Sequence, residues 1–287
     1  MSDRIDVRKT CKLYVAGAFI RSESGRTYEV VDKDGKFVAN VAQASRKDAR
    51  DAVVAARSAQ PGWAKATAYN RGQVVYRIAE VMEARRSELE QELQASSGLS
   101  AKQARKEVDS AVDRLVWYAG WSDKLSAIVG SNNAVAGPFF NFTVPSPMGV
   151  IAAFAPERSA LLGLVSVIAP IIVSGNTAVV VSSFSEPLTA VILSEILATS
   201  DVPAGVVNLL TGDRAELGQW LAEHMDVDGL DLTGVDSAEL AATLERGAAV
   251  NVKRVLRPSS PDWNETPTTA RLRRWLEAKT VWHPIGN

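Results

Sequence analysis

The chain has 287 residues, 46% hydrophobic and 23% charged, a composition typical of a folded protein with one large core or two smaller ones. Its 32 basic and 33 acidic residues give a formal net charge of −1, which supplies no field to attract nucleic acid or a membrane surface. Cys11 is the only cysteine, which excludes an internal disulfide framework and a multi-thiolate metal site. The two histidines, His224 and His283, are too few for a metal cluster.

The first residues, Met1 to Arg4, run into a mixed polar segment without the apolar core of a signal peptide. No uninterrupted apolar stretch is long enough to span a bilayer. We therefore expect a cytoplasmic protein that does not bind membranes.

Residues 12 to 42 alternate short apolar runs with turn signals, a pattern that predicts small antiparallel strands. Cys11 lies where the first of these strands begins. A thiol nucleophile needs a nearby base or oxyanion donor, and the neighbouring residues offer neither. We expect Cys11 to be an inert thiol at a strand edge.

Three helices are predicted next. The first begins at a capping box formed by Ser45 to Asp48 and ends at Pro61-Gly62. The second covers about 70–95, carries apolar residues on one side, and is closed by Gly98. The third covers about 100–125. It contains an aromatic cluster that we assign to core packing, namely Trp117, Tyr118 and Trp121.

From residue 149 the pattern changes to short β-rich runs that alternate with helices, which is typical of a parallel sheet covered on both faces. Strands are predicted at 149–155, 177–182, 205–210, 228–232 and 251–256. Helices are predicted at about 160–173, 187–200, 214–224 and 236–247. The fold class is therefore α/β, with a Rossmann-like doubly wound sheet whose ligands bind at the carboxyl ends of the strands.

After Leu256 the sequence becomes rich in proline and polar residues, as in a linker, and then ends with a brief helix and one strand that needs a sheet to join. These changes divide the chain into five parts. They are an N-terminal strand and helix region (1–130), a hairpin (131–148), the Rossmann-like domain (149–256), the linker (257–273) and a C-terminal tail (274–287).

Several segments together resemble the aldehyde dehydrogenase family. Leu13 to Phe19 is similar to the family's opening strand pair, and Ala52 to Arg57 with the following Pro61-Gly62-Trp63 is similar to its first helix. Tyr118 to Lys124 reads YAGWSDK, close to the family's YYAGWADK. Further segments follow in family order at Pro147–Val150, Ile168–Thr177, Pro187–Ala190, Val202–Asn208, Thr211-Gly212 and Leu232–Gly234. The resemblance covers roughly residues 12 to 256.

The chain departs from the family at the cofactor pocket. The turn that supplies an oxyanion-holding asparagine reads Pro156 to Ala160 here, with Arg158 at the asparagine position. The lysine and glutamate that contact the adenine-side ribose in the family align with Val181 and Phe184. Both polar contacts that the resemblance implies are thus absent.

A further departure concerns the turn that presents a helix amino end to the pyrophosphate in the family. Gly234 is kept, but Val235 replaces the family's serine and Glu239 replaces its second glycine. Asp236 adds a negative charge beside the phosphate position. These six residues, Arg158, Val181, Phe184, Gly234, Val235 and Glu239, form a degenerate pocket, and we expect no cofactor, or weak NAD(P) binding only.

The family's general-base glutamate, its nucleophilic cysteine and its catalytic domain have no counterpart after Leu256. The segment 276–282, in contrast, resembles the family's carboxyl-terminal tail, which forms an oligomerisation sheet with the hairpin before the cofactor domain. The resemblance therefore implies a pseudoenzyme, similar to the non-catalytic half of two-part aldehyde dehydrogenases. Its expected partner is a full-length aldehyde dehydrogenase, a second copy of itself, or both.

Three hypotheses follow. The first is a structural or regulatory subunit without catalytic residues, with the alternative that the hairpin and tail only cap the chain's own fold. The second is an NAD(P)-binding component that serves a catalytic subunit in trans. The third is a pocket re-used for another ligand with Arg158 as an anion anchor, against the simpler expectation that Arg158 faces solvent or pairs with Glu157 or Asp236.

Overall fold

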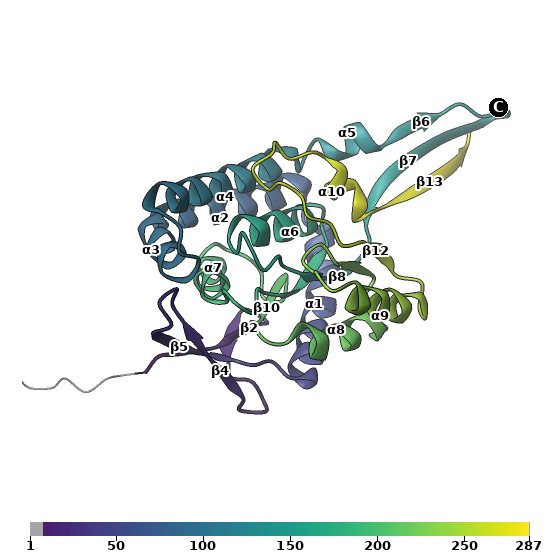
Figure 1. Cartoon of the computed structure of the whole chain (residues 1–287). Coiled ribbons are helices and arrows are strands. Elements are labelled where there is room, and N and C mark those ends of the chain that lie inside the picture. The colour runs from purple at the N-terminus through teal and green to yellow at the C-terminus, as the bar shows by residue number, and fades with distance from the viewer. Residues whose placement is uncertain (1–7, 287) are drawn as a thin grey trace, which may run out of the picture.

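The computed structural model describes residues 8–286 and is built around a mixed seven-stranded sheet in the order β12-β11-β8-β9-β10-β2-β3 (Figure 1). Five strands are parallel and fall where the sequence predicts them, which confirms the doubly wound α/β fold class. The antiparallel hairpin β2–β3 extends this sheet beyond β10. The strands are β2 (Leu13–Val15), β3 (Ala18–Ile20), β8 (Val150–Phe154), β9 (Thr177–Val181), β10 (Val207–Leu210), β11 (Gly229–Asp231) and β12 (Arg254–Leu256).

Helices cover both faces of this sheet, and its central strands, which are mostly apolar, are buried along their whole length. One face is covered by α1 (Arg46–Lys65), α8 (Arg214–Glu223) and α9 (Ala238–Ala249). The other face is covered by α2 (Ala68–Ala84), α4 (Ala101–Trp121), α6 (Leu162–Val173) and α7 (Leu188–Ala198), with α3 (Arg86–Ser96) packed against α4 and α7. The core therefore lies in two layers, one on each side of the sheet.

The first helix is longer than the sequence predicts, because α1 continues through Pro61-Gly62 to Lys65. Its last turn is held by Trp63, whose buried indole Nε1 donates a hydrogen bond of 2.8 Å to the carbonyl of Ile172. Burial of this large side chain stabilises the turn beyond the proline. The prediction that Pro61-Gly62 ends the helix was wrong.

The second and third predicted helices are each divided in two. Arg85, with φ −104° and ψ 15°, separates α2 from α3, and its guanidinium is paired with Glu88 and Glu195. The third helix ends at Trp121, and a short helix, α5 (Leu125–Val129), follows. The apolar pattern crosses both breaks, so periodicity alone could not locate them.

A second, three-stranded sheet contains β1 (Thr10–Cys11), β5 (Phe37–Ala42) and β4 (Thr27–Val31) in the order β1-β5-β4. Cys11 lies on the edge strand of this sheet and is 3% exposed. Burial raises the pKa of its thiol, which disfavours the reactive thiolate.

The C-terminal strand finds its partner within the chain. β13 (Leu276–Pro284) pairs antiparallel along its full length with β7 (Phe139–Pro147), whose other neighbour is β6 (Ser131–Asn133). We call this β13-β7-β6 sheet the arm, because it projects from the body of the molecule in Figure 1. The brief helix before it, α10 (Ala270–Arg274), begins earlier than expected, inside the segment assigned as linker. No helix in residues 8–286 has the length and apolar character needed to cross a membrane.

Candidate functional site at the strand ends

The chain passes from β8 to β9 and β10 on one side and then returns to β11 on the other side of β8. The loops after β8 and β11 therefore diverge at the carboxyl edge of the sheet. In doubly wound folds this crevice is where ligands bind. It is the candidate site that the sequence predicts, and the six residues of the degenerate pocket lie on the elements around it.

The crevice is bridged by Arg214, the first residue of α8. Its guanidinium donates hydrogen bonds to the carbonyl of Ala155, directly after β8, and to the carbonyl of Gly234, in the loop after β11. Arg214 is 9% exposed, so the charge is largely removed from water. A buried cation of this kind needs a counter-charge.

Glu157 supplies that counter-charge from the loop after β8. Its Oε1 lies 2.8 Å from Nη2 of Arg214, and its Oε2 accepts hydrogen bonds from the amides of Phe184, at 3.0 Å, and Ser185, at 3.1 Å. The hydroxyl of Ser183 donates to the same oxygen at 2.7 Å. Burial by itself would raise the pKa of Glu157, but Arg214 and these donors together hold it below its usual value.

A second carboxylate occupies the amino end of α6, the helix that follows β8. Glu107, on α4, accepts hydrogen bonds from the amide of Leu162 at 3.1 Å and from the hydroxyl of Ser159 at 2.9 Å. Ser159 has a φ of 59°, in the left-handed region that few residues other than glycine adopt. Helix amino ends attract anions, and here the anion belongs to the chain itself.

The six predicted residues lie in different surroundings. Arg158 is exposed and lines a cavity of about 410 Å³ together with Glu107, Glu186 and Asp262, so carboxylates outnumber cations there. Val181 and Val235 are buried in the apolar core beside α8 and α9.

The aromatic ring of Phe184 is 44% exposed and stacks on Tyr28, with 4.6 Å between ring centroids. Glu239 lies exposed in the first turn of α9. Glu157 pairs with Arg214, and the exposed position of Arg158 agrees with the simpler expectation for that residue.

Gly234 is fixed by backbone packing. A Cβ atom at this position would collide with the carbonyl oxygens of Ala155 and Phe154. The amide of Gly234 also donates to the Phe154 carbonyl at 3.1 Å. Gly234 thus allows the loop after β11 to lie against the end of β8. This packing role explains why a glycine occupies the position, and it does not require a bound phosphate.

Sequence reasoning missed Arg214, and it named Glu157 only as a possible partner of Arg158; the structure pairs Glu157 with Arg214 across the crevice. Glu157 lies directly before Arg158 in the turn after β8. Arg214 directly follows a turn at the end of β10, from which a long side chain can reach the neighbouring strand ends. The sequence did offer a signal for both residues, because each is a charged residue that closely follows the carboxyl end of a buried parallel strand.

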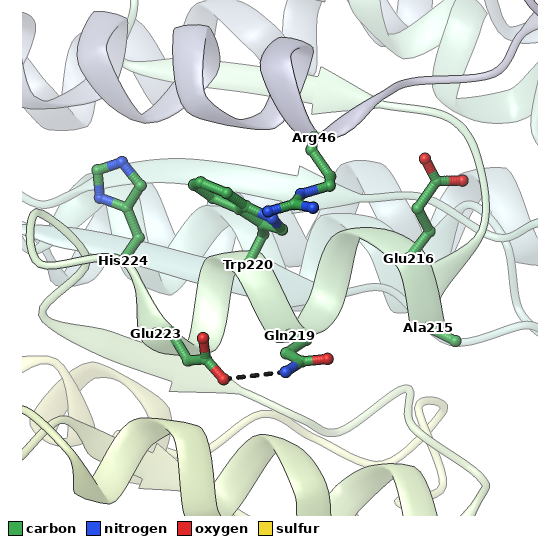
Figure 2. A pocket seen from close by; sticks show the side chains of 7 residues that line it. All are labelled: Arg46, Ala215, Glu216, Gln219, Trp220, Glu223 and His224. Atoms are coloured by element: carbon green, nitrogen blue, oxygen red, sulfur yellow. Dashed lines mark hydrogen bonds between the residues drawn. The ribbon is translucent and has the colours of Figure 1, made fainter.

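Another cavity, of about 440 Å³, lies along α8 beside the start of α1 (Figure 2). The guanidinium of Arg46 lies 4.4 Å from the centroid of the Trp220 ring. His224 and Glu216 also line the cavity, and Glu216 is paired with Arg26. This cavity lies beside α8, whereas the Arg214 guanidinium reaches the strand ends.

Within residues 8–286 no group of three acidic, histidine or cysteine side chains could hold a metal ion.

Comparison with known proteins agrees with the architecture. The family model described as aldehyde dehydrogenase family matches residues 19–257. The chain is 30% identical over 249 residues to D-glyceraldehyde dehydrogenase (NADP(+)) of Thermoplasma acidophilum, covering 85% of this chain and 49% of that protein. It is 31% identical over 247 residues to an aldehyde dehydrogenase of Aspergillus niger, covering 85% and 48%.

Among solved structures, the NAD+ complex of an aldehyde dehydrogenase from Bacillus cereus superimposes with a TM-score of 0.80 at 27% identity. The match covers 86% of this chain and 50% of that one. The chain thus spans about half the length of the relatives it matches. The match of the family model contains the five parallel strands of the sheet and the helices between them, and it ends just after β12.

Proposed function

Because the chain belongs to the aldehyde dehydrogenase family, we propose that it is a non-catalytic member that serves as a structural or regulatory subunit. The observation that carries this proposal is the Glu157–Arg214 ion pair across the strand-end crevice. The sole cysteine of the chain, Cys11, is buried at the edge of a different sheet. In residues 8–286 an ion pair therefore bridges the crevice, and the thiol of Cys11 lies on another sheet.

A nicotinamide dinucleotide does not fit the crevice as these residues stand. Its pyrophosphate needs exposed amide groups and space beside the strand ends. The amides of Phe184, Ser185 and Leu162 already donate to Glu157 and Glu107. Both carboxylates would also repel a phosphate. This disfavours the alternative of an NAD(P)-binding component that acts in trans.

The partner we propose is a full-length, active aldehyde dehydrogenase, a second copy of the chain, or both, held through the arm. β13 forms one edge of the arm, and its backbone groups on that side have no strand beside them within residues 8–286. Exposed apolar side chains lie along the arm, including Phe140 at 47% and Trp282 at 57%. An open edge with apolar side chains favours pairing with another chain.

Light scattering coupled to gel filtration tests this assembly. We expect the chain alone to form a dimer or larger species, or to co-elute with a full-length aldehyde dehydrogenase from the same source. Trp282→Ser in the arm should weaken the assembly, whereas Tyr69→Ser, a matched exposed aromatic on α2, should not. A chain that is strictly monomeric alone and with every such dehydrogenase would refute the proposed role.

A further inference from the structure

A cavity of about 480 Å³ lies beneath the segment 257–269, which crosses α4 and leads into α10. Three arginines line it, namely Arg114 on α4 and both Arg271 and Arg274 on α10. The aromatic rings of Tyr118 and Trp263 form part of its wall. No residue that lines this cavity belongs to the Glu157–Arg214 pair, although Arg271 reaches the end of β11 through its ion pair with Asp231.

Arg114 carries a buried charge that only neutral groups contact. Its side chain donates to the hydroxyl of Ser166 at 2.8 Å and to the carbonyls of Trp263, at 2.6 Å, and Glu265, at 3.1 Å. Arg114 is 7% exposed. A guanidinium removed from water is destabilising unless an anion neutralises it.

The three arginines differ in their counter-charges. Arg271 is paired with Asp231 at 2.8 Å. Across residues 8–286, neither Arg114 nor Arg274 has a carboxylate within ion-pair distance. Arg274 donates instead to the carbonyl of Val255. The cavity wall therefore carries two positive charges that the described part of the chain does not neutralise.

The positive groups act on one another across the cavity. Burial lowers the pKa of Arg114, and the nearby charge of Arg271 lowers it further. Burial raises the pKa of Tyr118, while Arg271 and Arg114 oppose that shift. The phenol therefore lies within the field of both guanidinium groups.

Two acidic residues also line the cavity. The carboxylate of Asp262 is exposed and is engaged in its own turn, where it accepts hydrogen bonds from the amide of Asn264 at 2.9 Å and from its side chain at 3.2 Å. Glu265 is exposed and contacts Arg114 through its backbone carbonyl. Within residues 8–286 neither carboxylate forms an ion pair with Arg114 or Arg274.

We propose that this cavity is a binding site for a small organic anion, either a carboxylate or a phosphate ester. Its acidic group neutralises Arg114 and Arg274, because guanidinium groups form strong charge-assisted hydrogen bonds with both kinds of anion. Its body lies against the half-buried ring of Trp263, which supplies flat apolar surface, while Tyr118 is buried behind the arginines. The proposal is independent of the proposed subunit role.

Calorimetric titration of the whole chain with benzoate, phenyl phosphate and neutral benzamide tests the site. We expect at least one of the two anions to bind with a dissociation constant below about 1 mM. Benzamide should bind at least about tenfold more weakly, since it lacks the charge. The relative affinities of benzoate and phenyl phosphate identify the class of acidic group. Failure of both anions to bind below about 10 mM, or equal binding of benzamide, overturns the proposal.

Two variants and a matched control locate the binding. Arg114→Met and Arg274→Met should each weaken anion binding about tenfold or more, whereas Arg105→Met, on the exposed side of the same helix α4, should leave it unchanged. Arg114 also holds the segment 257–269, so circular dichroism must confirm that its variant folds. If it does not, Arg274→Met decides, and an unchanged affinity in that variant overturns the proposal.

Discussion

The carboxylate of Asp231 lies 2.8 Å from Nη1 of Arg271 and joins the end of β11 to the helix before the terminal strand. Asp231 is fully buried, and its second oxygen accepts hydrogen bonds from the amide of Thr233 at 3.0 Å and from its hydroxyl at 2.5 Å. Arg271 also lies over the ring of Trp263 at 5.1 Å from the centroid. The pair therefore fixes the segment after β12 against the carboxyl edge of the sheet.

Breaking this pair should destabilise the protein strongly. Arg271→Met leaves a buried carboxylate without its counter-charge, which costs about 3 to 5 kcal/mol of the free energy of unfolding. Urea denaturation followed by circular dichroism measures the loss.

The double variant Asp231→Asn with Arg271→Met is the control for this prediction. It removes both charges and should lose less unfolding free energy than Arg271→Met alone, because no unpaired charge remains. A loss below about 1 kcal/mol in the single variant would show that water or another group already neutralises Asp231.

Gly234 provides a second prediction about stability. Gly234→Ala places a methyl group against the carbonyls of Ala155 and Phe154, so the loop after β11 must move and the unfolding free energy should fall by about 1 to 3 kcal/mol. Gly120→Ala, inside α4 with open space around its Cβ position, is the matched control. It should raise stability by about 0.5 to 1 kcal/mol. Equal stability of the two variants would contradict the packing role of Gly234.

Glu157 should make stability depend on pH in the acid range. Because its pKa is lower in the folded than in the unfolded protein, the folded state binds fewer protons there. Its contribution is complete above the unfolded pKa of about 4.3 and is lost as the pH falls through the lowered, folded value. We therefore expect Glu157→Gln to lower the unfolding free energy at pH 7, with a difference that shrinks toward pH 3. A difference independent of pH would assign the effect to packing.

Local patterns in the sequence were sufficient to predict the parallel half of the fold. The strands β8, β9 and β10 are short, mostly apolar runs, and turn residues such as Gly175 and Pro187 separate them from the helices between them, so these elements follow from neighbouring residues. The break at Arg85 was not predicted in this way, because the apolar pattern continues across it; the ion pair of Arg85 with Glu195 of α7 joins residues that are far apart in the sequence.

The candidate site likewise contains a contact between distant residues that local sequence patterns do not predict. The loss of the family's polar residues at Val181, Phe184 and Val235 can be recognised by alignment, because each is a replacement at one position. The ion pair across the crevice joins Glu157, in the loop after β8, to Arg214, at the start of α8. Only the order of the strands brings them together. The degenerate pocket stays a prediction from the resemblance, and the structure adds the ion pair at the strand ends.

Calorimetric titration of the folded chain with NAD+ and NADP+ tests the central claim most directly. The Glu157–Arg214 pair bridges the crevice, so we expect no saturable binding of either dinucleotide at concentrations up to about 1 mM. Binding with a micromolar dissociation constant would contradict the account, since it would require the crevice to open and would favour an NAD(P)-binding component acting in trans.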